Sequence, residues 1–227
     1  MKKIIRKALI DTFPVMTGYV CLGFGFGILL HSAGYGIFEA FVMSVTMYAG
    51  SMQYIAVGLL AGGASLLTVA LTTLLVQARH LFYGISMLQK YQNVGKRKLY
   101  LIFALTDETY SLMCNDHSDI PLSNRKDYYL AVSMLNHSYW ITGCVLGATV
   151  GTLVNFNSEG IDFVLTALFV TIFLEQWLGT KKHAPAIIGV VASVLCLVVF
   201  GGDKFLIPTM VAIAVSLSLY KEEKTDD

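Results

Sequence analysis

Two acids and an arginine stand inside apolar stretches of this chain, where charged groups are rare. Asp107 and Glu108 lie in the stretch 99–114 (LYLIFALTDETYSLMC), and Arg79 ends the apolar run 64–78. Ionisable groups at the depth of a bilayer are costly, and those that are kept usually line a polar path or a binding site. These residues make a membrane transporter the first hypothesis.

The two acids are adjacent, so their side chains point about 100° apart if the segment is a helix. Because burial favours the neutral form of a carboxyl group, one of them could bind and release a proton near neutral pH. This predicts a proton relay or a site for a substrate ammonium group. The alternative is structural, with an ion pair to Arg79 or an N-cap at Thr106 followed by acids in the first helical turn. We favour function because segment 99–115 is otherwise apolar.

Arg79 and His80 follow each other directly after an apolar run. The guanidinium group of Arg79 could bind a substrate carboxylate through two parallel hydrogen bonds. It could equally pair with Asp107 or Glu108, or extend to the membrane interface. His80 could relay protons, although a single histidine beside an apolar run is more often a packing group.

A break of small and polar residues, Tyr48-Ala49-Gly50-Ser51-Met52-Gln53, interrupts the apolar segment 37–60. If two half-helices meet there, one N-terminus offers free amide donors and a partial positive charge, which suit a substrate carboxylate. Gly50 permits close approach of the backbone, and Ser51 and Gln53 add hydrogen-bonding groups. The alternative is a kink softened by glycine.

Segment 128–151 carries an amide, an imidazole and an indole in Asn136-His137-Ser138-Tyr139-Trp140. Hydrogen bonding between helices is the structural alternative for such groups in hydrocarbon. With this group added, the predicted substrate-binding residues are Gly50, Ser51, Gln53, Arg79, Asp107 and Asn136. The predicted proton-coupling residues are Asp107, Glu108, His80 and His137.

The composition supports a membrane location for these groups. Hydrophobic residues form 56% of the 227 residues, charged residues form 14%, and the mean hydropathy is +0.65. Soluble domains contain about 25% charged residues, and no polar stretch here is long enough for a soluble domain. A net charge of +1 argues against a nucleic-acid partner. The four cysteines lack ligand spacing, so we expect no metal or other cofactor.

Apolar segments of roughly the length of a membrane span fill most of the chain. They predict an all-α integral membrane protein, a compact bundle of about seven to eight hydrophobic helices, some broken or short, in one polytopic domain over 1–227. The predicted segments are 13–31, 37–60, 64–88, 99–115, 128–151, 161–178, 184–200 and 205–220.

Glycines suggest an internal repeat with halves 1–115 and 124–220. A shift of 124 residues places Gly23, Gly27 and Gly36-Ile37 on Gly147, Gly151 and Gly160-Ile161. Short or glycine-interrupted segments in corresponding halves are common in transporters. The alternative is that glycines four residues apart form a packing face of small residues.

Basic residues predict a cytoplasmic N-terminus, because MKKIIRK precedes the first apolar segment. Eight full crossings would then place the basic loop 89–98 outside, against the positive-inside bias. The conflict disappears if one earlier segment enters and leaves on the same face. The broken segment 37–60 is the one we suspect.

Taken in order, four of these motifs resemble the AzlC family of bacterial inner-membrane proteins. They are Tyr48-Ala49-Gly50-Ser51-Met52-Gln53, Arg79-His80-Leu81-Phe82-Tyr83-Gly84, Thr106-Asp107-Glu108 and Asn136-His137-Ser138-Tyr139-Trp140. The resemblance covers nearly the whole chain. It departs at the break, where many relatives have Ala-Gly-Ala-Ser-Gln, and at Gln77, where an asparagine is usual.

The resemblance implies export of branched-chain amino acids (leucine, isoleucine or valine) from the cell, together with a small hydrophobic partner protein of the AzlD type. A zwitterionic substrate needs a carboxylate site, an ammonium site and an apolar pocket, and the candidate residues could supply the first two. A membrane acid that binds protons could couple export to the proton gradient. The expected location is the bacterial inner (cytoplasmic) membrane.

Four other functions remain open at the level of sequence. The chain could be a subunit that works only with its partner, a transporter of another small zwitterionic solute, or a passive channel. An intramembrane enzyme using Glu108, His80 and His137 is disfavoured, because no HExxH or comparable metal-ligand spacing occurs. We therefore expect a protein that is not an enzyme.

Overall fold

The computed structural model describes residues 2–92, 94–114 and 120–153, and towards the C-terminus residues 170, 173–174, 177–178, 183–202 and 205–219. It divides into two compact units, Met1–Val164 and Leu165–Asp227. The regular elements of the described residues are helices, which confirms the predicted all-α class. Most of the predicted segment 161–178 lies outside the described residues, and the single-domain arrangement stays a prediction.

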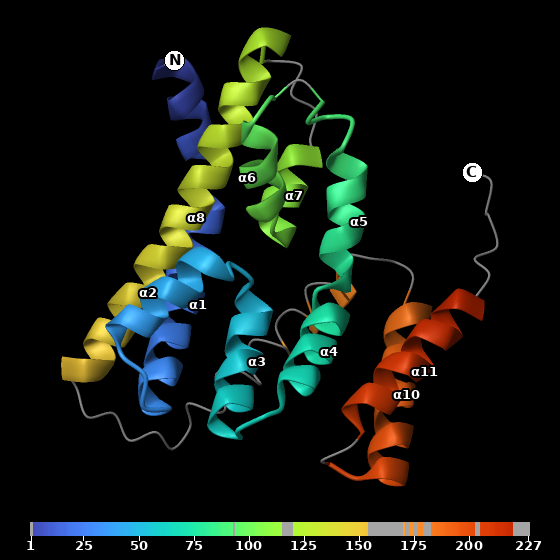
Figure 1. The fold of residues 1–227 in the computed structure, drawn as a ribbon. Helices are drawn as coiled ribbons and strands as arrows, with labels where there is room; N and C mark the ends of the chain where they lie inside the picture. Colours follow the sequence, from blue (N-terminus) through green and yellow to red (C-terminus); the bar gives the residue numbers. More distant parts are fainter. Residues whose placement is uncertain are drawn as a thin grey trace. The chain divides into compact units, whose positions relative to one another are not determined.

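Two long helices, α1 (Lys2–Ser32) and α8 (Leu122–Leu153), run side by side in the same direction through the first unit (Figure 1). At their N-terminal end the hydroxyl of Tyr128 donates to Asp11 at 2.6 Å. At their C-terminal end Gly151 lies against His31. We call these the N-terminal end and the C-terminal end of the first unit.

Glycines let the two helices touch backbone to backbone. A Cβ atom at Gly27 would overlap the backbone of Cys144, and one at Gly147 would overlap the backbone of Phe24. The packing face of small residues is therefore what the structure shows for these glycines. Gly160-Ile161, the remaining part of the predicted repeat, lies outside the described residues, and the repeat stays a prediction.

The broken segment 37–60 forms a hairpin that enters from the C-terminal end and turns back halfway. Helix α2 (Ile37–Thr46) follows α1 after a short turn and reaches the middle of α8, where the Ser44 carbonyl accepts from His137. Helix α3 (Gly50–Ala61) starts near the middle of α8 and runs back towards the C-terminal end. Along it, the hydroxyl of Tyr54 donates to the Leu22 carbonyl of α1 at 2.6 Å. The hairpin tip holds Tyr48 at φ 41°, the one positive φ among the described non-glycine residues.

Helices α4 (Leu66–Val76) and α5 (Ala78–Met87) together lead back to the N-terminal end (Figure 1). The axes of Leu66–Leu74 and Ala78–Met87 differ by 46°. Met87, at the end of α5, joins a buried cluster with Ala8 of α1. Arg79 thus lies at the bend, in the middle of the crossing.

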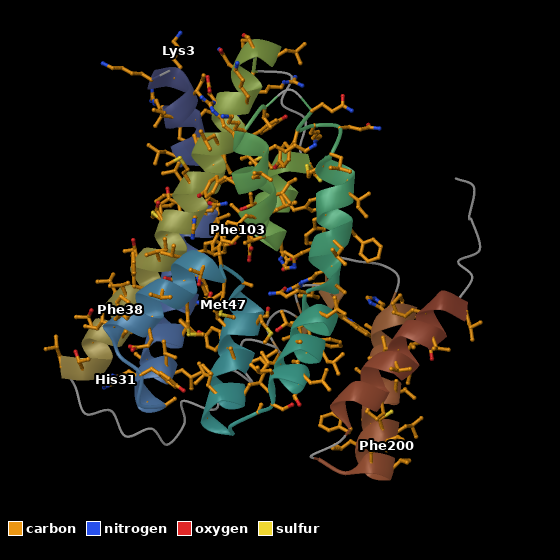
Figure 2. The ribbon with its side chains drawn as sticks, in the orientation of Figure 1. Lys3, His31, Phe38, Met47, Phe103 and Phe200 are labelled. Carbon is orange, nitrogen blue, oxygen red and sulfur yellow. The ribbon has the colours of Figure 1, made fainter. Side chains whose placement is uncertain are left out.

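A second hairpin enters from the N-terminal end. Helix α6 (Arg97–Phe103) begins with the ion pair of Arg97 and Asp127, and helix α7 (Asp107–Cys114) returns to the same cluster as Met87. Figure 2 shows Met47 and Phe103, close to the two hairpin tips, at levels between Lys3 and His31 of α1. The two tips therefore meet near the middle of the unit from opposite ends.

This topology gathers the basic residues at one end. In the described part of the first unit, every lysine and arginine except Arg79 lies at or near the N-terminal end: Lys2, Lys3, Arg6, Lys7, Lys90, Lys96, Arg97, Lys98, Arg125 and Lys126. The conflict with the positive-inside bias arose from counting segment 37–60 as a full crossing. Because that segment turns back, loop 89–98 falls at the same end as the N-terminus.

Large apolar side chains cover the outer faces of the helices. On α5 the side chains of Leu81, Phe82 and Ile85 are exposed. In the second unit, α10 (Ala184–Phe200) packs with α11 (Leu206–Leu219) and has no buried residue. Within the described residues, α1 alone is long and apolar enough to cross a membrane as one helix, and the bent pair α4–α5 passes the same test jointly.

The glycine contact gives a direct test of the helix pair. We expect Gly27→Ala to destabilise the protein by at least about 1–3 kcal/mol, because the added methyl group has to displace the backbone of α8. Gly18→Ala on the same helix meets no atom within 4 Å and should be neutral or slightly stabilising. Thermal unfolding in detergent measures both. Equal stabilities of the two variants would contradict the contact.

Labelling of single cysteines tests the hairpin topology. In a background without the four natural cysteines, Lys3→Cys and Gln92→Cys should react with an impermeant maleimide from one side of the membrane, and Ser65→Cys from the other. Gln92 and Ser65 are both exposed in connections between helices. Labelling of Gln92→Cys and Ser65→Cys from the same side would show that α4 and α5 do not form a crossing.

Candidate functional site

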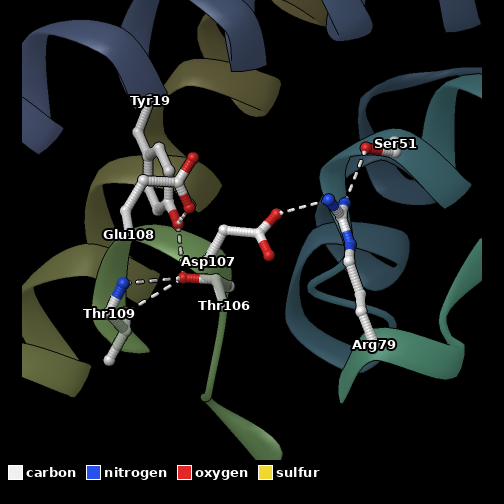
Figure 3. A network of polar contacts seen from close by, with 7 residues as sticks. All are labelled: Tyr19, Ser51, Arg79, Thr106, Asp107, Glu108 and Thr109. Carbon is white, nitrogen blue, oxygen red and sulfur yellow. Dashed lines mark hydrogen bonds and ion pairs between the residues drawn. The ribbon is translucent and has the colours of Figure 1, made fainter. Parts of the chain in front are cut away.

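Three helix N-termini meet near the middle of the first unit, and Arg79 joins them. The Arg79 guanidinium group lies 3.0 Å from the Asp107 carboxylate of α7 and donates to the Ser51 hydroxyl of α3 at 3.4 Å (Figure 3). Arg79 itself is in the first turn of α5. The side chains of Arg79 and Asp107 are each about one third exposed, at 33% and 38%. Arg79 of α5 therefore contacts the tips of both hairpins, through Ser51 of the first and Asp107 of the second.

The start of α7 is held by a group of hydroxyls. Thr106 caps the helix, because its side-chain oxygen accepts from the backbone N–H of Thr109 at 3.3 Å. The hydroxyl of Tyr19, from the middle of α1, lies 2.6 Å from both the Thr106 oxygen and Glu108. The Asn136 amide of α8 donates to the Thr109 hydroxyl at 3.0 Å. Glu108 thus faces α1, while Asp107 faces α5.

The start of α3 packs on Trp140 of α8. The indole N–H of Trp140 donates to the side-chain oxygen of Gln53 at 2.7 Å. A Cβ at Gly50 would lie 3.2 Å from the Trp140 ring, so glycine allows the close fit. Gln53 is completely buried, and this bond fixes the direction in which its amide nitrogen points.

The two histidines differ in their surroundings. The Nε2 atom of His137 donates to the Ser44 carbonyl at 3.2 Å, and its Nδ1 atom accepts from Tyr100 at 3.1 Å. Both ring nitrogens are occupied, and the ring lies 4.2 Å from that of Tyr48. His80 contacts the ring of Tyr83, and its Nδ1 atom has no hydrogen-bond partner.

Several buried polar atoms near the tips have no hydrogen-bond partner. Gln53 Nε2 and Arg79 Nε are donors, Asp107 Oδ1 and Asn136 Oδ1 are acceptors, and the Tyr48 hydroxyl can act as either. Buried polar groups in native proteins are usually paired, so such a group calls for an explanation. Free donors and free acceptors at one level are what a molecule with both a carboxylate and an ammonium group would satisfy.

The predicted site residues therefore all lie in the middle of the first unit, although not in one contact network. Arg79 contacts Ser51 and Asp107 directly. Glu108 and Asn136 contact the hydroxyl-bearing side chains at the start of α7. Gly50 and Gln53 lie against Trp140. Both structural alternatives for the acids, the Thr106 cap and the Arg79 pair, are present. No group of three His, Cys, Asp or Glu side chains suited to a metal occurs among the described residues.

Tyr19 is a site residue that sequence reasoning missed. It is buried in the middle of α1, with its hydroxyl on Glu108 and its ring 5.6 Å from that of Trp140. Its position could have been recognised from the sequence, because a tyrosine deep inside a predicted span needs a hydrogen-bond partner for its hydroxyl. The glycines in the same segment indicate helix packing and carry no information about this partner.

Comparison with known proteins agrees with the sequence motifs. The family described as "AzlC protein" matches residues 14–154. The chain is 44% identical to the "Branched-chain amino acid transport protein AzlC" of Bacillus subtilis, over 96% of this chain and 85% of that protein. It is 40% identical to an "Uncharacterized membrane protein" of Helicobacter pylori, over 96% of both chains.

A more distant relative is the "Inner membrane protein YgaZ" of Escherichia coli, 28% identical over 81% of this chain and 78% of that protein. No solved structure matches the chain significantly. The names of the relatives, together with the apolar helices, confirm that this is an integral membrane protein. The matched family and the 44% identity also confirm the resemblance of the motifs: the chain belongs to the AzlC family.

Proposed function

We propose that this protein exports branched-chain amino acids across the bacterial cytoplasmic membrane and binds them between the tips of its two hairpins. The observation that carries the proposal is the set of unpartnered donors and acceptors around the Arg79–Asp107 ion pair. The substrate class is supported by the name of the Bacillus subtilis relative, which is a branched-chain amino acid transport protein.

The substrate carboxylate binds at the start of α3. The first N–H groups of a helix have no partner within the helix, and the helix dipole favours an anion there. Ser51 and Arg79 meet at this point, and the free Nε2 of Gln53 adds a donor from the same turn. Discontinuous helices whose N-termini face an anionic substrate group are a recurring transporter device.

The substrate ammonium group binds at the start of α7. Asp107 Oδ1 and Asn136 Oδ1 are the free acceptors there. Because Arg79 and Asp107 carry opposite charges, a zwitterionic substrate can replace their ion pair without leaving either charge uncompensated. As substrate enters, its carboxylate takes the place of Asp107 on Arg79, and its ammonium group takes the place of Arg79 on Asp107. The rings of Tyr48 and Phe103, 6.4 Å apart, supply apolar surface for the side chain.

Export against a gradient needs an energy source, and Asp107 and Glu108 are the acids that couple transport to protons. His80, with a free Nδ1, is a further candidate for proton transfer, and His137 becomes one only if its present bonds open. The basic N-terminal end faces the cytoplasm, in keeping with the positive-inside bias. A small hydrophobic protein of the AzlD type completes the transporter.

Loading cells with leucine-, isoleucine- or valine-containing dipeptides tests substrate and direction together. We expect the internal amino-acid pool to fall when this protein and its small partner are produced together, and not with either alone. A pool that no combination changes would remove export of this substrate class. A fall with this protein alone would show that no partner is needed, and flux without saturation would indicate a channel.

Substitutions in the central ion pair test the binding site. Arg79→Lys keeps the charge but loses the forked geometry that matches a carboxylate. We expect it to lower export at subsaturating substrate at least about tenfold, or ~1.4 kcal/mol of binding. Asp107→Asn should do the same.

The matched controls are Arg97→Lys and Asp127→Asn, which change the exposed ion pair at the N-terminal end. They should leave export unchanged at equal amounts of protein in the membrane. Unimpaired export by both central variants would place the substrate elsewhere.

A further inference from the structure

Tyr48, at the tip of the first hairpin, has two costly features that its packing does not explain. Its φ of 41° lies in the left-handed region, which a bulky residue rarely adopts and which glycine adopts without strain. Its hydroxyl is buried without a hydrogen-bond partner, although a phenylalanine would fill the same space without burying a polar group. Strained backbone is typical of functional sites, and an unsatisfied buried group calls for an explanation. The two observations are independent and fall on the same residue.

The ring of Tyr48 is held in place by three other elements. It lies 4.2 Å from the His137 ring of α8, and 6.4 Å from the rings of Tyr19 of α1 and Phe103 of α6. Only 3% of the residue is exposed. These contacts fix the direction of the ring, so the hydroxyl at its end has a defined position.

The Tyr48 hydroxyl lies beside the start of α7. Its polar neighbours are Thr109 and Glu108 of that helix, and Tyr19. Tyr19 donates to Glu108, and the Thr109 oxygen accepts from Asn136. The neighbours are thus engaged with other groups, while the Tyr48 hydroxyl has no partner among the described residues. Its oxygen therefore offers an open acceptor position.

The charge beside this hydroxyl distinguishes the two ends of a zwitterionic substrate. A carboxylate bound to Tyr48 would face the acid Glu108, and like charges repel strongly in an apolar surrounding. An ammonium group is attracted instead, and a primary one donates through three N–H bonds. The proposed ammonium site has two free acceptors, Asp107 Oδ1 and Asn136 Oδ1. It therefore lacks one acceptor for a primary ammonium group.

We propose that the Tyr48 oxygen is the third acceptor of the ammonium site, which makes Tyr48 a substrate-binding residue that selects a primary ammonium group. The three oxygens come from three elements, α7, α8 and the tip of the first hairpin, so they can approach one group from different sides. The ring of Tyr48 remains beside Phe103, where it borders the substrate side chain. The ammonium ligand rests on the proposed function, whereas the strain and the unsatisfied hydroxyl of Tyr48 do not.

Thermal unfolding of the purified full-length protein tests the hydroxyl without substrate. Tyr48→Phe keeps the ring and removes only the unsatisfied group, so its Tm should equal or exceed that of wild type. Tyr91→Phe is the matched control, because the Tyr91 hydroxyl is also buried without a partner, in the cluster at the N-terminal end. A Tm of Tyr48→Phe clearly below that of wild type would show that the hydroxyl stabilises the free protein, and would overturn the inference.

Leucine binding separates the two tyrosines. Tyr48→Phe should weaken binding about tenfold or more, the loss expected for one hydrogen bond to a charged group. Tyr91→Phe should bind leucine as wild type does.

N-methylleucine tests which end of the substrate meets the hydroxyl, because its ammonium group has only two N–H bonds. Methylation should weaken binding to wild type. In Tyr48→Phe the methyl group can take the place of the missing hydroxyl, so the factor lost on methylation should be at least about threefold smaller.

Equal leucine affinity of Tyr48→Phe and wild type would overturn the inference and leave the proposed function standing. Additive effects of methylation and Tyr48→Phe would also overturn it, since the hydroxyl would then not bind the ammonium group. Wild type that binds no leucine, alone or with its small partner, would instead overturn the proposed function and with it the ammonium ligand.

Discussion

Polar backbone in an apolar surrounding is the constraint on which this structure depends. A helix that stops halfway through a membrane leaves N–H groups or carbonyls without partners, and such ends are tolerated only inside protein or beside a polar cavity. This chain stops two helices halfway, at Thr46 and Phe103, and starts the next ones at Gly50 and Asp107. Both breaks pack against the α1–α8 pair, through Tyr19 and His137, and Arg79 connects them. The costly features are thus concentrated at one level, where one arginine contacts both hairpins.

The α1–α8 contact sets the position of everything at that level. Because the glycines bring these helices together backbone to backbone, Tyr19 and Asn136 project from them towards the same hairpin tips. Tyr48 keeps a positive φ with its buried side chain among aromatic rings, an unusual backbone state of the kind that clusters at functional sites. The rigid pair and the strained tip support the same interpretation, in which close packing holds a small polar centre in a defined geometry.

The sequence predicted the residue types of the centre better than their partners. Asp107, Glu108 and Arg79 stand out because charge is rare in apolar stretches, and the break at residues 48–53 stands out by composition. The hairpin at that break was suspected from the basic loop 89–98, since charge bias constrains topology. The hairpin at α6–α7 was not, because segment 99–115 has the length of a short span. The two acids differ in their partners, since Asp107 pairs with Arg79 and Glu108 accepts from Tyr19. Both partners are distant in sequence from the acids, so no local pattern could show which acid contacts which.

The order of elements brings a hairpin to the centre from each end of the first unit. Helix α1 is followed by a hairpin that enters at the end where α1 stops, and the bent helix α4–α5 is followed by a hairpin that enters at the opposite end. The two pairs of elements therefore run in opposite directions, an arrangement that in transporters places the binding site near the middle of the membrane. Arg79 of α5 contacts both tips, through Ser51 of the first hairpin and Asp107 of the second. In the proposed function, a substrate that replaces both halves of the Arg79–Asp107 ion pair would weaken the contacts by which Arg79 holds the two tips, so binding itself would favour the movement of one hairpin relative to the other.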